Sequence, residues 1–314
     1  MTEDQWKGRS KRGYMYVIMA AFLWASSGCA AKFLFNGGVS PFQLVQLRIT
    51  IATIVLFAFL AVKRPNLLKI AKKDIFYFIV LGTLGMASAQ FFYLFAISKI
   101  NVSAAILLEY LSPTLIALYM ILFAGEKPDR LTLSAIGAAF AGACLATGAW
   151  RLDILTMNMA GIVSGLFSAV AFAWHSVHGE YGMRRYDPWT VLFYALLVGA
   201  VIWNAIIPPL DSFFQAYSPM KWMVILYVGT FGTVVPFALY FKGINLIRSP
   251  GACATATLEP IIAGILCHFF LNEPITPPQV AGGLLVIGSI ILLMSKTTHD
   301  PNTPEAMRCP GKMR

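Results

Sequence analysis

Charged residues are scarce in this sequence, and that scarcity decides the class of protein. Only 12% of the 314 residues are Asp, Glu, Lys or Arg, whereas 58% are hydrophobic and the mean hydropathy is +0.70. A soluble domain usually carries about 25% charged residues. So little charge cannot cover the surface of a soluble fold of this length, and most of that surface must therefore face lipid.

Several sequence signatures of chemistry are also missing. There is no Gly-x-x-x-x-Gly-Lys-Ser/Thr phosphate loop, no Gly-x-Ser-x-Gly elbow and no His/Cys/Asp cluster with metal spacing. The five cysteines form no Cys-x-x-Cys pair. We therefore predict no catalytic residue, no metal and no cofactor. The net charge of +10 arises from short basic clusters between apolar runs, which argues against a nucleic-acid partner.

What the sequence does contain is a series of apolar stretches. A spanning helix needs roughly 20 mostly apolar residues, and backbone groups in lipid must bond internally. We therefore predict an all-α membrane protein with ten transmembrane helices. The predicted helices cover residues 14–34, 42–62, 75–97, 102–124, 131–149, 158–178, 189–208, 222–242, 250–271 and 277–295.

The basic residues predict the orientation. With the N-terminus inside and alternate loops assigned, 19 Lys and Arg residues face the cytoplasm and four face outside. This bias predicts a multi-pass protein of the cell inner membrane with both termini cytoplasmic. Residues 1–13 form a cytoplasmic N-terminal tail in this scheme, and residues 296–314 form a disordered cytoplasmic C-terminal tail.

An internal repeat appears when the chain is shifted by 147 residues. Gly82-Thr83-x-Gly85 then aligns with Gly229-Thr230-x-Gly232, and Leu111-x-Pro113 aligns with Leu258-x-Pro260. The repeat units are residues 14–149 and 158–295, with five predicted helices each. An odd number of helices inverts the second unit relative to the first, and inverted repeats are a recurrent plan of secondary transporters, with the substrate site near the midplane between them.

These features resemble the EamA-like group of the drug/metabolite transporter superfamily. The resemblance rests on the doubled five-helix unit, the segment 21–27, Arg48, and the two Pro-containing helices that end in Gly125-Glu126 and Asn272-Glu273. It implies a central cavity lined by the first, third, fourth, sixth, eighth and ninth helices. It also implies the export or exchange of amino acids, related metabolites, amines or drugs.

Two acidic residues lie inside predicted helices, where a charge costs roughly 2.5–3.5 kcal/mol. Glu109 and Glu259 can each bind a proton or meet a cationic group, and a carboxyl that only holds an interhelical contact is the structural alternative. Pro113 and Pro260 free the carbonyls four residues before them. These openings suit a substrate contact or a hinge, or they are plain kinks.

Other polar and aromatic side chains within the helices complete the candidate site. Some of these side chains share a helix face, as Gln90 and Tyr93 do, and His175 offers a group that titrates near neutral pH. Interface tyrosines and packed histidines are the structural alternatives. The predicted substrate-binding residues are Trp24, Ser27, Gln90, Tyr93, Glu109, Tyr110, Trp174, His175, Tyr240 and Glu259.

A second group is predicted to act in gating or structure rather than in contact with substrate. Arg48 can bind an anion, but pairing with a carboxylate or with carbonyls is favoured, and Glu126 and Glu273 sit at helix ends. This group comprises Arg48, Pro113, Glu126, Pro260 and Glu273. Gly161-x-x-x-Gly165 and the small residues of the fifth and tenth helices predict close helix packing.

The sequence thus predicts a secondary transporter that exports small organic metabolites, such as amino acids or amines, by alternating access. Its partners are a small-molecule substrate and the lipid bilayer. Coupling to protons and passive facilitation both stay open, as does the oligomeric state. An integral membrane enzyme or a lipid-handling protein is the alternative, although the short loops offer no polar catalytic cluster.

Overall fold

The computed structural model describes residues 3–100, 102–123, 125, 129–146, 158–208, 211–271, 276–295 and 303–308, and these ranges are helical with no strand. The α-helices are α1 (Glu3–Asn36), α2 (Pro41–Lys63), α3 (Ile75–Val80), α4 (Ser88–Lys99), α5 (Val102–Glu109), α6 (Ser112–Leu122), α7 (Arg130–Ala146), α8 (Met159–Met183), α9 (Pro188–Ile206), α10 (Pro219–Gly229), α11 (Val235–Ala256), α12 (Glu259–Leu271), α13 (Pro277–Ser295) and α14 (Pro304–Arg308). The described ranges also contain short 3₁₀ turns and π-helices. The 3₁₀ turns are η1 (Pro65–Leu68), η2 (Lys72–Asp74) and η5 (Asp211–Phe213), and the π-helices are η3 (Leu81–Ala87) and η6 (Thr230–Val234).

Seven helical segments in the described ranges are long and apolar enough to cross a membrane. They are Gly8–Asn36, Pro41–Lys63, Lys72–Lys99, Ala105–Leu122, Met159–Met183, Pro188–Ile206 and Pro219–Ala256. Arg130–Leu145 and Val280–Leu292 are shorter apolar helices. Large apolar side chains are exposed on the outside, such as Phe76 at 74% and Leu284 at 66%, as expected for a surface in contact with lipid. The chain is therefore an all-α, multi-pass membrane protein.

Polar caps start the helices at the turns that the sequence marks. Ser40 and Gln43 form a capping box at the start of α2. Asn158 accepts a backbone bond at the start of α8, and Asp187 and Ser218 do the same for α9 and α10. These side chains satisfy backbone N–H groups that have no partner within the helix.

The repeated Gly-Thr-x-Gly motifs lie at the two π-helices, where backbones approach closely. A Cβ on Gly82 would lie 2.5 Å from Val198 of α9, and a Cβ on Gly229 would lie 2.8 Å from Ile51 of α2. Both contact pairs are related by the same shift of 147 residues. The next glycines behave alike, since Gly85 lies against α8 and Gly232 against α1.

The helical segments that contain Pro113 and Pro260 are interrupted at three places. Residues 110–111 separate α5 from α6, and residues 257–258 separate α11 from α12. Pro113 and Pro260 are each the second residue of the helix after the break, so they start helices rather than kink them. Within α11, Arg248 is non-helical, with φ 63° and ψ 169°, so the helical run that begins at Pro219 turns there.

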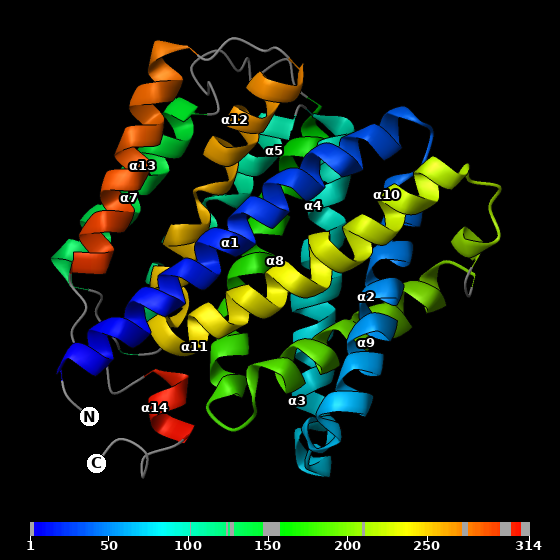
Figure 1. Cartoon of the computed structure of the whole chain (residues 1–314), viewed down its shortest axis with the longest axis horizontal. Helices are drawn as coiled ribbons and strands as arrows, with labels where there is room; N and C mark the ends of the chain where they lie inside the picture. Colours follow the sequence, from blue (N-terminus) through cyan, green and yellow to red (C-terminus); the bar gives the residue numbers. More distant parts are fainter. Residues whose placement is uncertain are drawn as a thin grey trace.

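In Figure 1, α1 and α11 run side by side across one face of the bundle, and α7 and α13 pair at its edge. The glycines predicted for close packing account for part of this arrangement. A Cβ on Gly142 would lie 2.8 Å from the carbonyl of Gly282 in α13, and a Cβ on Gly165 would lie 2.6 Å from Leu108. Gly137 and Gly288 meet nothing within 4 Å.

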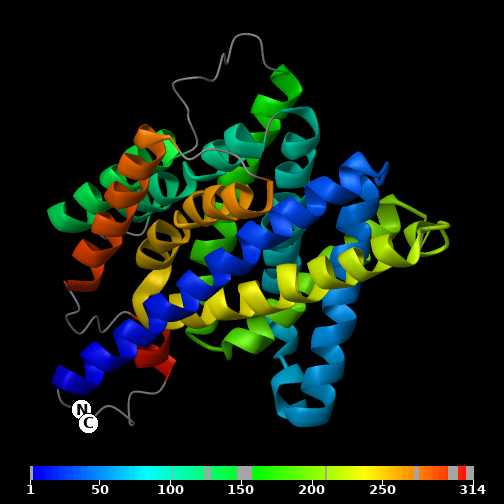
Figure 2. The same ribbon diagram turned by 45° about the horizontal axis from the view of Figure 1, so that its top comes forward.

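The predicted tails differ from the structure where they are described. Residues 3–13 form the first turns of α1 rather than a separate tail. Residues 304–308 of the predicted disordered tail form α14, where Arg308 donates to the carbonyls of Met183 (2.9 Å) and Tyr186. Glu305 pairs with Arg9, so α14 docks at the end of the bundle where α1 begins, as Figure 2 also shows.

Candidate functional site

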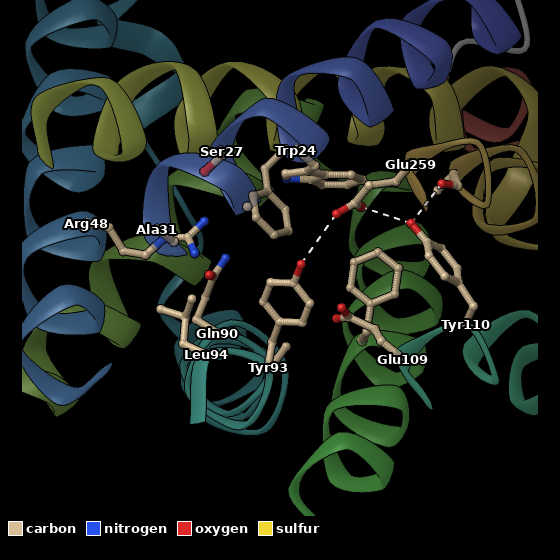
Figure 3. A pocket seen from close by; sticks show the side chains of 15 residues that line it. Trp24, Ser27, Ala31, Arg48, Gln90, Tyr93, Leu94, Glu109, Tyr110 and Glu259 are labelled. Atoms are coloured by element: carbon tan, nitrogen blue, oxygen red, sulfur yellow. Dashed lines mark hydrogen bonds between the residues drawn. The ribbon is translucent and has the colours of Figure 1, made fainter. Parts of the chain in front are cut away.

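A cavity lies among the helices beside the second half of α1. The space between its lining side chains, with the open mouth included, is about 620 Å³. Helices α1, α2, α4, α5, α8, α11 and α12 contribute to its wall (Figure 3). The lining residues are Trp24, Ser27, Gly28, Ala31, Arg48, Ala89, Gln90, Tyr93, Leu94, Glu109, Tyr110, Phe172, Phe237, Ala256 and Glu259.

Glu259 is held by two tyrosines. Tyr110 donates to Oε2 at 2.9 Å, and Tyr93 donates to Oε1 at 3.4 Å (Figure 3). The Tyr110 hydroxyl also lies 2.9 Å from the carbonyl of Ala256, one of the two carbonyls that the prolines free. The helix break before Pro260 therefore supplies an acceptor that helps to fix the Tyr110 side chain beside the carboxyl.

Glu109 lies on the same side of the cavity with less support. Ser168 of α8 donates to Oε1 at 3.1 Å, and Oε2 has no hydrogen bond to any described residue. Glu109 is the last residue of α5, directly before the break at residues 110–111. The break thus brings a carboxyl with one unused oxygen to the cavity wall.

Arg48 lies on the other side of Tyr93, with its guanidinium beside Gln90 (Figure 3). Its Nε donates to Thr233 Oγ1 at 3.1 Å, and its Nη2 donates to the Gly232 carbonyl at 3.2 Å. Both acceptors belong to η6, and π-helices expose backbone groups that an α-helix would use. We predict a structural role for Arg48. The structure shows hydrogen bonds that fit this role, and it also shows that Arg48 lines the cavity.

Aromatic rings form the wall between these charges. Trp24 packs against Phe237 and Phe172, with ring centroids 5.1 and 6.0 Å apart, and against Tyr240 at 5.3 Å. These edge and tilted contacts hold the indole in place. A rigid aromatic plate of this kind can receive an apolar side chain or a cation.

Three predicted binding residues lie outside this cavity. Tyr240 is fully buried. Its hydroxyl forms a 2.8 Å hydrogen bond with Ser176 Oγ, and its ring packs against Trp24. Trp174 stacks on His178 with centroids 3.6 Å apart. His175 stacks on Phe241 at 4.9 Å, and neither ring nitrogen has a hydrogen-bond partner among the described residues. The structure therefore gives these three a packing role in this conformation.

The remaining predicted residues divide as follows. Trp24, Ser27, Gln90, Tyr93, Glu109, Tyr110 and Glu259 line the cavity. Glu126 and Glu273 lie outside the described residues. The sequence argument missed Phe172, Phe237 and the anchors of Arg48, Gly232 and Thr233. The repeated Gly-Thr-x-Gly motif marks the segment that holds the two partners of Arg48. The motif alone does not show that this segment packs against α2.

Membrane-spanning helices around a polar cavity with charged side chains define a membrane transporter, because intramembrane charges mark substrate and ion pathways. The EamA-like transporter family model matches residues 11–148 and again residues 159–295. The chain belongs to this family, within the drug/metabolite transporter superfamily. Its family and its relatives are transporters and not enzymes.

Relatives extend along nearly the whole chain. The uncharacterized inner membrane transporter YicL of Salmonella typhimurium is 28% identical over 91% of this chain and 96% of its own length. The threonine/homoserine exporter RhtA of Escherichia coli is 26% identical over 88% of both chains. A solved structure described only as "Crystal structure of protein" has the same fold, with a TM-score of 0.71 over 89% of this chain and 95% of its own, at 20% identity.

Proposed function

We propose that this protein is a secondary transporter that exports small amino acids or related amines from the cytoplasm. The cavity carries this proposal, because it combines one guanidinium, two carboxyls and an aromatic wall within a membrane-spanning bundle. Such groups are costly in a membrane and suit a polar, charged solute. The similarity to an exporter of threonine and homoserine supports the same substrate class and direction.

We further propose that ten helices form two inverted five-helix units around the cavity. The double family match and the paired Gly82–Val198 and Gly229–Ile51 contacts support this arrangement. Each unit also has a helix broken before its proline, at residues 110–111 and 257–258. Discontinuous helices at a repeat interface are typical of sites that work by alternating access.

The proposed orientation places both termini in the cytoplasm. In vesicles of known orientation, single cysteines introduced at residues 63–73 and at residues 211–221 should react with an impermeant thiol reagent from opposite sides. Reaction of both segments from the same side would overturn the inverted arrangement and the orientation that depends on it.

Export itself is tested in proteoliposomes loaded with labelled amino acids and amines. Gly28→Leu should abolish efflux, because Gly28 lines the cavity and a side chain there would fill it. Gly288→Leu is the matched control, since Gly288 is exposed with nothing within 4 Å of its Cβ position. Equal efflux from both variants, or no efflux above protein-free vesicles in the wild type, would contradict the proposal. A pH gradient across the same vesicles separates proton coupling from passive flux.

A further inference from the structure

The charged groups of the central cavity are not in direct contact with one another. Arg48 forms no ion pair with any described residue, and neither do Glu109 and Glu259. Arg48 is only 4% exposed and Glu259 only 8%. Buried charges are normally paired, because an isolated ion in a low-dielectric site is strongly unfavourable. A bound ligand can therefore supply the opposite charges that these side chains lack.

Arg48 offers an anion site. A guanidinium has five N–H donors, and Arg48 uses two groups of them, Nε on Thr233 and Nη2 on the Gly232 carbonyl. Its Nη1 has no hydrogen-bond partner among the described residues. The guanidinium faces the cavity next to the Gln90 amide (Figure 3), whose Nε2 donates a weak hydrogen bond to the Met86 sulfur at 3.7 Å. A fork of unused donors beside an amide fits a carboxylate.

Glu109, rather than Glu259, offers the matching cation site. Each oxygen of Glu259 already accepts a hydrogen bond from a tyrosine hydroxyl, so this carboxyl is held within the wall. Glu109 keeps Oε2 unbonded within the described residues, and only Ser168 holds its other oxygen. An ammonium group with three donors can complete the bonding of this carboxyl.

We propose that the cavity selects an amino acid as its zwitterion, with the carboxylate bound by Arg48 and the ammonium group bound by Glu109. This inference rests on the proposed transport function and narrows it from amines and amino acids to solutes that carry both charges. Figure 3 shows Arg48 on one side of Tyr93 and Glu109 on the other, so one solute can reach both only by crossing the cavity beneath Trp24. A plain amine leaves Arg48 unpaired, and a plain carboxylic acid leaves Glu109 unpaired.

The test compares three forms of one ligand on the purified wild-type protein. The 20 proteinogenic L-amino acids are first screened by thermal stabilisation, and the best of them is then titrated against its amide and its N-acetyl derivative. Each derivative lacks one of the two charges. Loss of a buried charge partner should weaken binding at least about 30-fold for either derivative. No stabilisation by any of the 20, or an amide that binds as tightly as the free acid, overturns the inference.

Variants that remove one charge from the cavity test which residue binds the carboxylate of the ligand and which binds its ammonium group. In Arg48→Gln, the preference for the free acid over the amide should shrink to about threefold or less, because the carboxylate loses its partner. In Glu109→Gln, the preference for the free amine over the N-acetyl form should shrink in the same way. Lys73→Gln and Glu305→Gln, which remove the same charges outside the cavity, should keep both ratios. Collapse of the N-acetyl ratio in Glu259→Gln instead of Glu109→Gln would overturn the assignment.

The wild-type comparison needs no variant and therefore stands even if Arg48→Gln fails to fold. It also separates this inference from the broader function. If proteoliposomes export a plain amine as well as any amino acid, the transporter stands and the zwitterion site falls. If the zwitterion binds with the predicted ratios but no solute crosses, the transport function falls instead.

Discussion

Glu180 and Arg248 form a buried ion pair, with Arg248 Nε 2.8 Å from Glu180 Oε1. The other carboxyl oxygen accepts from the backbone N and the Oγ of Ser249, at 2.7 and 2.6 Å. Arg248 is the one non-glycine residue with positive φ in the described ranges, so the pair holds a strained break in α11 against the last turns of α8.

Removing one member of this pair should destabilise the protein strongly. In Glu180→Ala the buried guanidinium loses the Glu180 carboxylate, and the free energy of unfolding should fall by about 3–5 kcal/mol. Thermal unfolding in detergent measures the change. The control is Glu305→Ala, which breaks the partly exposed pair with Arg9 and should cost about 1 kcal/mol or less. Similar losses in both variants would show that the Glu180–Arg248 pair has no special role.

Gly232 should not tolerate a side chain. A Cβ at this position would lie 2.2 Å from Ser27 Oγ and 2.7 Å from Ser27 Cβ, so Gly232→Ala must push α1 away from η6. We expect a loss of about 1–3 kcal/mol in stability, together with weaker binding in the cavity. Gly137→Ala is the matched change at an open helical site and should be neutral or stabilising by up to about 1 kcal/mol. Equal melting temperatures of the two variants would contradict this packing.

The two tyrosines on Glu259 should contribute unequally. Tyr110→Phe removes a hydroxyl 2.9 Å from both Glu259 Oε2 and the Ala256 carbonyl, leaving two buried acceptors without it. Its cost should be about 1–3 kcal/mol of stability. Tyr93→Phe removes a longer contact of 3.4 Å and should cost less. Chemical or thermal unfolding of both variants checks the order, and a larger loss in Tyr93→Phe would reverse it.

His175 is buried, and its ring nitrogens have no hydrogen-bond partner in the part of the chain that the structure describes, which a core position rarely allows. Replacement by an apolar residue of similar size, His175→Leu, should leave stability unchanged or raise it by about 1 kcal/mol, because two desolvated nitrogens are removed. Efflux should persist if His175 only packs between Phe241 and Gly85. Loss of pH-driven efflux at unchanged stability would instead restore the predicted proton path.

The sequence predicted the helical, membrane-spanning class because charge and hydropathy decide it directly. It also named, as substrate-binding, seven of the fifteen residues that line the cavity, since a polar residue such as Gln90 or Glu109 within an apolar run needs a polar neighbour. Arg48 was harder to assign. Its partner Thr233 lies 185 residues away in the chain, and this contact depends on how η6 packs against α2.

We predict both Trp24 and Trp174 as substrate-binding residues, but the two lie in different surroundings. In the structure Trp24 lines the cavity from α1, whereas Phe172 does so from α8 and Trp174 stacks on His178. Segments that are similar in sequence need not face the same space, because each packs against different neighbours.

Two-sided thiol labelling tests alternating access most directly. In a cysteine-free background, Ser27→Cys reports on the cavity wall and Ser176→Cys on a position that is fully buried against Tyr240 in this structure. Substrate should slow labelling of Ser27→Cys from one side of the membrane and make Ser176→Cys reactive from the other. Substrate flux with Ser176→Cys unreactive throughout, or with Ser27→Cys reactive from both sides at once, would contradict the mechanism.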